Sequence, residues 1–346
     1  MRTTRTGPRP HDDRPRRTVR DAAHVARITA ALALLGVLAA CSVRLETPPQ
    51  AEPSPGPVEQ VRARTLDDAT ELTAAANAAL ATHPDKAIAA VLTDVAEFST
   101  QHAAQLGPAY DSGLTPSPTT TPTPLTARPT DVLDDLGAAT RTALTDADAV
   151  DDPGLARLVA SIATARDQLT RRLARAAGTK TPDLTVETPA PAPAQPTSTA
   201  SATPEPGAAP DGLAALVLAH DQAGYAFEVI AAQQSGDLRD RAVASAADHR
   251  AQAQRWATTA GLADTKDDPR RAAYAVPDGL SKATTARKLA VSLESAVTEA
   301  NAALVAGTNP GERVPYLDGM RRADAAARTW GGTPVAFPGL PERAHG

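Results

Sequence analysis

The sequence has little cysteine and few aromatic residues. Its 346 residues include one cysteine, Cys41, and 3% Phe, Trp and Tyr. A single cysteine excludes disulfides within the chain and any metal site built from several thiolates. With so few aromatics, a core has to be built from alanine, leucine and valine, and alanine has the highest helix propensity and no side-chain entropy to lose. These absences favour closely packed helices.

Signals for β-strands and for common catalytic motifs are also missing from the sequence. No run of Val, Ile, Thr and aromatic residues alternates with polar residues as a strand would. Gly-x-Ser-x-Gly, a phosphate-binding glycine-rich loop and a Walker motif are absent as well. We therefore expect an all-α protein, and favour a non-catalytic role while enzymatic activity stays open.

Charge is distributed unevenly along the chain. Residues 1–40 hold eight arginines and three aspartates, so the formal net charge of −5 for the whole chain leaves about −10 on the remainder. Nucleic-acid affinity comes largely from neutralising phosphates, which an acidic protein does poorly. We expect no nucleic-acid partner.

Arg16-Arg17 could belong to a twin-arginine export signal or be part of the general positive charge of a signal peptide. The sequence does not distinguish these two export routes.

The N-terminus has the parts of a lipoprotein signal peptide. The arginines precede an apolar run, Ile28–Leu38, which is short for a membrane span but suits a signal peptide. The run ends in Leu38-Ala39-Ala40-Cys41, which resembles the bacterial lipobox. We predict cleavage after Ala40 and lipid attachment to Cys41, so that the exported protein is held at the outer face of the cell membrane. A plain signal peptide followed by an incidental cysteine is the alternative.

Proline-rich segments divide the rest of the chain. Residues 41–57 are typical of a tether, and residues 181–210 of a disordered Pro/Ala/Thr linker, because such composition buries too little apolar surface to order. A Pro/Thr-rich insert at 112–129 interrupts the first region between them, 58–180. The second region is 211–346.

Each of the two regions has the pattern of four helices. Pro153 suits a first helical turn and Gly178 a helix end. Glycines at 236, 261 and 307 are expected to end three helices of the second region. The predicted helices are 58–82, 85–106, 130–148 and 153–177 in the first region, and 211–235, 238–260, 281–306 and 313–330 in the second.

The two regions share features that suggest a repeat. In both, the longest break follows the second helix, and both second helices contain His-x-Ala-Gln, at His102–Gln105 and His249–Gln252. Four shared residues in an alanine-rich chain also arise by coincidence. A diverged duplication and an unrelated pair of helical sets both remain open.

The second region resembles a known family. The segments Ala219–Tyr225, Asp248–Arg250, Val291–Glu294 and Ala336–Glu342 resemble an actinobacterial ferritin-like domain family of unknown function, over about residues 211–342. Phe-Pro-Gly-Leu-Pro-Glu at 337–342 is the most specific part. The resemblance implies a ferritin-like four-helix bundle, commonly on a lipoprotein, without an assigned activity.

A di-iron site of the ferritin type is not expected. Such a site takes a carboxylate from each of two helices and Glu-x-x-His from each of the other two, and none of the eight predicted helices carries that motif. His220, His249 and Glu294 nevertheless fall near the middles of three helices of the second region, hence in one layer. They are candidate ligands for a single Zn or Fe ion. The alternative is a hydrogen-bonded structural cluster. Asp221, next to His220, is expected to be a surface charge. Tyr225 and Glu228 either add a hydroxyl and a further carboxylate to the site or form the core edge and the solvent face.

The sequence thus predicts a lipid-anchored cell-envelope protein with helical modules on Pro-rich spacers. We expect it to bind an unknown envelope protein or component without a cofactor. The alternative function is a divergent ferritin-like metalloprotein that binds one metal ion through His220, His249 and Glu294.

Overall fold

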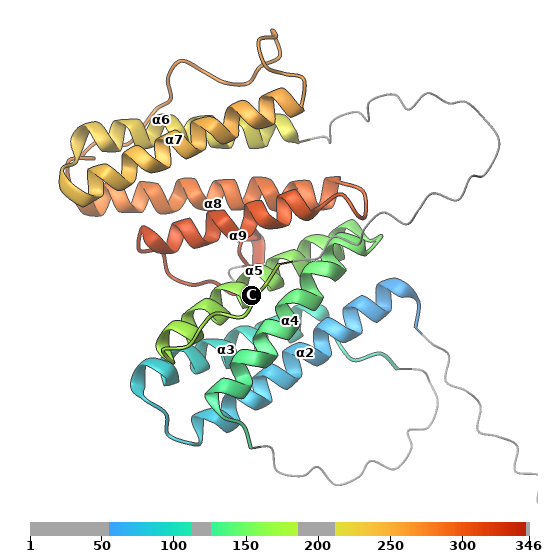
Figure 1. The fold of residues 1–346 in the computed structure, drawn as a ribbon. Coiled ribbons are helices and arrows are strands. Elements are labelled where there is room, and N and C mark those ends of the chain that lie inside the picture. Colours follow the sequence, from blue (N-terminus) through green and yellow to red (C-terminus); the bar gives the residue numbers. More distant parts are fainter. Residues whose placement is uncertain (1–54, 112–125, 186–211, 344–346) are drawn as a thin grey trace, which may run out of the picture. The chain divides into compact units, whose positions relative to one another are not determined.

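The computed structural model describes residues 55–111, 126–185 and 212–343 (Figure 1). These residues form eight α-helices, a short 3-10 turn and no strand, so this part of the chain is all-α. The elements are α2 (Pro57–Leu80), α3 (Lys86–Leu106), α4 (Pro129–Ala149), α5 (Pro153–Ala176), α6 (Leu213–Gln233), α7 (Gly236–Thr259), α8 (Ala283–Gly307), α9 (Val314–Thr329) and η1 (Pro341–Arg343).

The helix positions confirm the eight predicted helices to within a few residues. Asp152 caps α5, its carboxylate accepting the Leu155 amide proton at 2.6 Å, and Pro153 follows in the first turn. At the other end, Gly178 adopts a φ of 65°, and Thr179 N–H donates to Ala174 O. One expectation is wrong: Gly236 does not end a helix but begins α7, because Ser235 before it already has the extended backbone of an N-cap.

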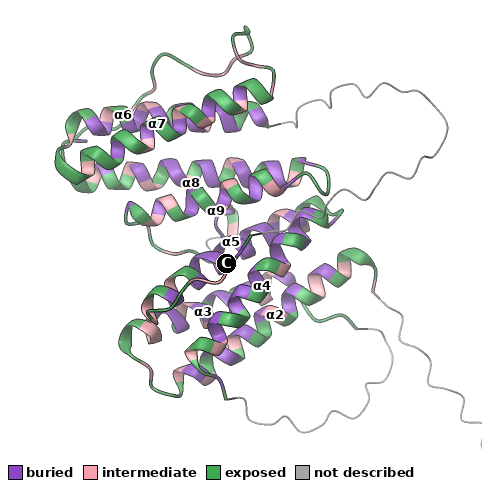
Figure 2. Ribbon diagram, in the orientation of Figure 1, coloured by how far each residue is buried: buried purple, intermediate pink, exposed green. Residues whose placement is uncertain are grey.

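The first helix set consists of α2 to α5. The hairpin of α2 and α3 packs on the hairpin of α4 and α5, with contacts between α2 and α4 and between α3 and α5. Its core is built from small and branched side chains, and α5 is buried along most of its length, as the purple ribbon in Figure 2 shows. Burial on nearly all sides is what a central helix of a bundle requires.

The second helix set consists of α6 to α9, and like the first it is built from two helix hairpins in chain order. The α6–α7 and α8–α9 hairpins meet through α6 and α8, whereas α7 and α9 have no comparable packing. The long connection of residues 260–282 joins α7 to α8. This order and crossover are those expected of a ferritin-like bundle; the structure itself establishes the all-α class.

The two helix sets share a core. Helix α5 packs against both α8 and α9, and one apolar cluster joins Val159 and Ala163 of α5 to Val297 and Met320 of the second set. Helix α8 is long and apolar enough to cross a membrane, and half of its apolar stretch is buried inside the protein. Its contacts with α5, α6 and α9 account for that composition, since a helix packed on several sides is apolar all round.

The C-terminal segment after α9 lies on the first helix set. His102 of α3 donates through Nε2 to Ala336 O at 2.8 Å, and Phe337 packs edge-on against the His102 ring. Ser161 of α5 donates to Pro338 O at 2.8 Å. The segment that carries the most specific part of the family resemblance is therefore held by α3 and α5, outside the residues that resemble the family.

Residues 181–185, which we assigned to the second linker, lie against α4. Leu184 is buried, and Asp183 O accepts a hydrogen bond from Arg141. The signal peptide of residues 1–40, the lipobox residues Leu38, Ala39 and Ala40, and Cys41 itself lie outside the described residues. So do most of the tether, the insert from 112 to 125 and the linker from 186.

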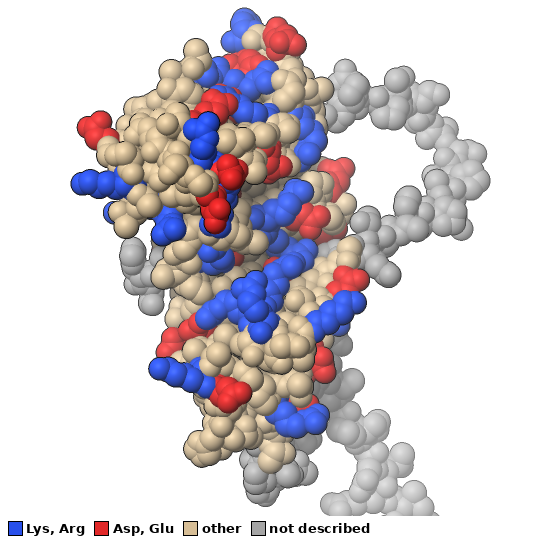
Figure 3. Space-filling model, turned by 60° about the vertical axis from the view of Figure 1, so that its left-hand side comes forward, with Lys and Arg blue, Asp and Glu red and all other residues tan. Residues whose placement is uncertain are grey.

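Charged side chains of both signs are interspersed on the face seen in Figure 3, where lysines and arginines also gather near the middle. Several arginines of the bundles are paired: Arg171 and Arg321 both bind Asp167, and Arg172 binds Asp94. Asp167 is buried and shared by two arginines, whereas the Arg172–Asp94 pair is partly exposed. Ion pairs at the surface contribute little to stability, in general about 0–1 kcal/mol each.

Candidate functional site

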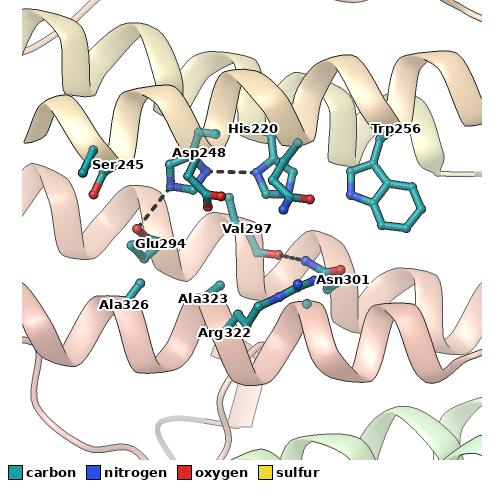
Figure 4. A pocket seen from close by; sticks show the side chains of 14 residues that line it. His220, Ser245, Asp248, Trp256, Glu294, Val297, Asn301, Arg322, Ala323 and Ala326 are labelled. Carbon is teal, nitrogen blue, oxygen red and sulfur yellow. Dashed lines mark hydrogen bonds and ion pairs between the residues drawn. The ribbon is translucent and has the colours of Figure 1, made fainter.

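The structure brings the three candidate residues of the second helix set together in a polar row. His220 Nδ1 of α6 lies 2.9 Å from His249 Nδ1 of α7, and His249 Nε2 lies 3.2 Å from Glu294 Oε1 of α8 (Figure 4). The exposed fractions of His220, His249 and Glu294 are 7%, 5% and 2%. Mid-helix position alone predicted this layer. The polar row is the name used below for these three residues.

The polar row is linear, and its geometry does not converge on one point. His249 turns one ring nitrogen to His220 and the other to Glu294, and the two nitrogens of an imidazole point away from each other. Over the described ranges, no group of three or more His, Cys, Asp and Glu side chains is arranged to hold a metal ion. A single ion bound by all three residues would require the His249 ring to give up one of its contacts.

Burial keeps His220 neutral. Loss of hydration, together with smaller contributions from the neighbouring His249, Arg255 and Arg322, lowers the pKa of His220 to about 3. The pKa lies below physiological pH, so the His220 ring carries one N–H and one lone pair. It acts as donor on one side and acceptor on the other.

A cleft opens onto the polar row between α7 and α9. Its volume is about 250 Å³, which suits a small molecule or one side chain of a partner. On the α9 side, Gly319, Ala323 and Ala326 are small and Arg322 is the one long side chain, whereas α7 contributes polar and aromatic side chains. The remaining lining residues are His220, Ala244, Ser245, Asp248, His249, Gln252, Trp256, Glu294, Val297, Asn301 and Arg322. We call it the α7–α9 cleft.

Small side chains on α9 explain why the cleft is open. Gly319, Ala323 and Ala326 follow the spacing of one helix face, so apart from Arg322 the α9 side of the cleft presents only small side chains. Gly319 also permits the close approach of Asn301 on α8, because a Cβ at Gly319 would lie 2.1 Å from Asn301 Oδ1. Figure 4 shows Ser245 and Trp256 at opposite ends of the pocket.

The corresponding space in the first helix set is filled. There α3 packs against α5, and the fully buried Arg166 occupies the interior, paired with Asp68 at 3.1 Å and donating to Thr65 O. Burial, and to a lesser extent the charge of Arg166, lowers the pKa of His102 to about 3. The same helix order thus gives a closed bundle in one half and an open one in the other.

Asp221 is not the surface charge that we expected. It points away from the polar row, as predicted, but it is buried and accepts hydrogen bonds from Tyr274 Oη at 2.6 Å and from the Arg271 amide at 3.1 Å. Arg250 of α7 completes its partners. Asp221 therefore fastens the long α7–α8 connection to α6, which helix spacing could not reveal because two of its partners lie in that connection.

Tyr225 and Glu228 lie outside the cleft. Glu228 is exposed and pairs with Arg250 at 2.9 Å, and the half-buried Tyr225 packs edge-on against Tyr274. The Glu-x-x-His spacing does occur once beyond the helices, at Glu342 and His345. Glu342 pairs with Arg157 of α5, and His345 lies outside the described residues.

Sequence reasoning missed several cleft residues, chiefly Asn301, Asp248, Trp256 and Arg322. Helical spacing could have found some of them: Asn301 follows Glu294 by seven residues and so shares its face of α8. Nothing in the sequence predicts that Arg322 lines the cleft, because this position depends on the separation between α9 and α7.

Comparison with known proteins places a family over this helix set. Residues 212–342 match the family model described as "Domain of unknown function (DUF4439)". The matched segment runs from α6 into the 3-10 turn and includes every residue that lines the α7–α9 cleft. It spans well under half of the chain, and we call it the DUF4439 region. The predicted resemblance to a family of unknown function is thus confirmed for these residues. No curated protein and no solved structure matches the chain.

Proposed function

We propose that this chain is a lipid-anchored cell-envelope protein whose DUF4439 region is a non-catalytic, ferritin-like binding module. The lipobox ending in Cys41 supports the anchor and the location, and the Pro-rich segments support a module held away from the membrane. Its partner is an envelope protein or component that enters the α7–α9 cleft.

One observation carries the binding role. The bundle leaves α7 and α9 apart at the point where three buried polar side chains form its floor, although the first helix set closes the same gap. An open, polar-floored cavity loses packing energy unless something fills it, and interiors are in general close-packed. We infer that a ligand supplies the missing contacts.

The cleft lacks the arrangement expected of a hydrolytic enzyme. Ser245 is the one hydroxyl among its lining residues, and in the part of the chain that the structure describes no hydrogen bond joins it to His220 or His249. A serine nucleophile is activated by a base within hydrogen-bond reach. Binding without chemistry is the simpler use of this cavity.

The alternative is a divergent ferritin-like metalloprotein that binds a single Zn or Fe ion through His220, His249 and Glu294. Their proximity supports it, and the two contacts of His249 oppose it. Metal analysis separates the two readings: the chain from Ser54 onward, purified without a metal-binding tag, is offered Fe²⁺, Zn²⁺ and Mn²⁺. About one tightly held ion per chain, lost in His249→Ala, would replace the binding-module proposal.

The two tryptophans of the chain provide a test of binding. Trp256 lines the cleft, whereas Trp330 is buried against Phe227. In protein labelled with 5-fluorotryptophan, a panel of small polar compounds screened by ¹⁹F NMR should give hits that move the Trp256 resonance and leave Trp330 in place. If no compound class moves Trp256 selectively, the cleft is not a binding site.

A further inference from the structure

A second pocket lies where α5 of the first helix set packs against α9 of the second. Its volume is about 360 Å³, and it shares no lining residue with the α7–α9 cleft. Four arginines line it: Arg171, Arg172 and Arg175 come from α5, and Arg328 comes from α9. We call it the α5–α9 pocket. A pocket with so many guanidinium groups is suited to an anion.

Positive charge exceeds negative charge in the α5–α9 pocket. Asp167 and Asp324 are the acidic residues of its lining, so the four guanidinium groups leave two positive charges uncompensated. The ion pairs of the lining extend outward to Asp94, to Arg321 and, through Arg321, to the exposed Asp318. One positive charge remains in excess when these three are included.

Two of the arginines have N–H donors without acceptors. Arg172 donates through Nη2 to Asp94 at 2.6 Å, and Arg328 donates through Nη2 to Asp324 at 2.6 Å. Among the described residues, Nη1 of Arg172 and both Nε and Nη1 of Arg328 find no acceptor, although these atoms are buried. A buried donor without a partner is costly. The two side chains are 25% and 20% exposed, so each guanidinium can turn toward a ligand.

Two further side chains of α5 lack partners in the pocket. Gln168 is 7% exposed and lines the pocket, and its amide makes no hydrogen bond with the part of the chain that the structure describes. The side chain of Arg175 is exposed in the last turn of α5 and likewise has no partner there. Residues 168, 172 and 175 share one helix face by their spacing. This face of α5 therefore offers an amide and two guanidinium groups to a ligand.

We propose that the α5–α9 pocket binds the phosphate group of a phosphate monoester. Such a group carries close to two negative charges at neutral pH and has three terminal oxygens that accept hydrogen bonds. It matches the excess charge of the lining and the free donors on α5 and α9. A carboxylate brings one charge and two oxygens in one plane, for which a single arginine is sufficient.

The size of the pocket favours an ester over the free ion. A volume of about 360 Å³ leaves room beside the phosphate for the organic group that carries it. Soluble phosphate esters and phospholipids with a monoester headgroup share this chemistry. The site is separate from the α7–α9 cleft, so it adds a second ligand to the proposed function and does not depend on the first.

The experiment uses the chain from Ser54 onward, the compact unit that holds every described helix. Glycerol 3-phosphate is titrated at constant ionic strength in a phosphate-free buffer at about pH 7.5, where its phosphate is mostly doubly charged. The ³¹P NMR line of the ligand should broaden and shift saturably. Inorganic phosphate should displace it, and acetate should be at least about tenfold less effective because it brings half the charge.

A second measurement distinguishes a soluble ester from a lipid headgroup. The same chain is sedimented with phosphatidylcholine vesicles, with and without phosphatidic acid, whose headgroup is a phosphate monoester. Sedimentation that needs phosphatidic acid and is competed by glycerol 3-phosphate assigns the pocket to a lipid headgroup. Binding of glycerol 3-phosphate without sedimentation assigns it to a soluble ester. Both results agree with a phosphate site.

Substitutions locate the phosphate. Arg328→Lys keeps a cation beside Asp324 but removes the fork of guanidinium donors, and should weaken glycerol 3-phosphate binding by about tenfold. Arg175→Gln breaks no ion pair and should weaken it by about threefold or more through loss of charge. Arg271→Gln makes the same charge change at an exposed position of the α7–α8 connection, outside the pocket, and should leave binding unchanged.

A further variant covers a failure to fold. If circular dichroism shows that Arg328→Lys is unfolded, Gln168→Leu removes the amide at nearly constant side-chain volume and should weaken glycerol 3-phosphate binding by about threefold or more.

Several outcomes would overturn the inference. An unchanged ³¹P line at every ratio of ligand to protein, or equal displacement by acetate and phosphate, excludes a phosphate site. Unchanged affinity in folded Arg328→Lys and Arg175→Gln places the ligand elsewhere, and an equal loss in Arg271→Gln reduces the effect to overall charge. None of these results involves Trp256, so the α7–α9 cleft would keep its proposed function.

Discussion

The Arg313 amide donates a hydrogen bond to the Asp148 carboxylate at 2.8 Å, and the Arg313 side chain returns to the helix that carries Asp148. Its guanidinium donates to Ala147 O at 2.9 Å and Val150 O at 2.7 Å, at the C-terminal end of α4. The end of α4 and the beginning of α9 thus cap each other across the two helix sets. A cation at a helix C-terminus and an anion at an N-terminus are both favourable to the helix dipoles.

Replacing Arg313 should therefore destabilise the protein strongly. The side chain is 1% exposed, so Arg313→Met leaves buried carbonyls without donors. We expect the free energy of unfolding to fall by about 3 kcal/mol, since hydrogen bonds to charged groups contribute about 1.5–3 kcal/mol each. Urea unfolding measures the difference. Arg287→Met, at an exposed position of α8, is the control and should change stability by less than about 0.5 kcal/mol.

Acid should destabilise the fold through its buried histidines. The pKa of His102 and of His220 is about 3 in the folded chain, against an ordinary value of 6.5. The unfolded chain therefore binds more protons between these values, and stability falls as pH drops below about 6.5, by about 1.4 kcal/mol per pH unit for each histidine.

A substitution isolates the contribution of His102. His102→Gln keeps a donor for Ala336 O and removes the titration, so the slope of unfolding free energy against pH between about pH 6 and 4 should decrease by about 1.4 kcal/mol per unit. His83→Gln, at an exposed position, should leave the slope unchanged. An identical slope in His102→Gln and the unaltered chain would mean that His102 is already protonated in the folded protein.

Filling the cleft should abolish ligand binding without unfolding the protein. Ala326→Leu adds bulk on the α9 face that lines the cleft, and extra methylene groups are tolerated where space is free. We expect the response of Trp256 to cleft ligands to be lost while stability changes by no more than about 1 kcal/mol. Ala325→Leu, on the exposed neighbouring face, should retain the response. Binding that survives in Ala326→Leu would place the ligand elsewhere.

The proposed lipid anchor leads to a prediction of its own. Cys41→Ser removes the thiol that would carry the lipid, so the protein should lose incorporation of labelled palmitate and leave the membrane fraction. Ser42→Ala keeps the thiol and should behave as the unaltered chain. Membrane association that persists in Cys41→Ser, without label, would indicate an uncleaved signal peptide as the anchor.

The helices were predictable from sequence because their signals are local. Alanine-rich stretches, the proline at 153 and the glycine at 178 act within a turn or two, and each falls where the structure has a helix or its end. The polar row was predictable for a related reason: mid-helix residues of aligned helices share a layer. The alternative that these residues bind a metal ion was based on residue type alone. The structure shows that His249 uses both of its ring nitrogens, one toward His220 and one toward Glu294, and type cannot reveal this.

The cleft and the buried Asp221 were beyond local reasoning. The α7–α9 gap depends on which pairs of helices come into contact, and Gly319, Ala323 and Ala326 fit a tight interface as well as an open one. Asp221 is buried because Tyr274 and Arg271 return to it from some fifty residues along the chain. Long-range pairings of this kind leave no periodic trace.

The position of the C-terminal segment also has a consequence in time. Synthesis delivers a chain from its N-terminus, so α3 and α5 are made long before Ala336 and Pro338 are. Until then the Nε2–H of His102 and the hydroxyl of Ser161 lack the carbonyls that they bind in the finished protein. Helices α3 and α5 are thus made early but gain these hydrogen bonds last. A chain stalled before its final residues would leave the His102 and Ser161 side chains exposed to water.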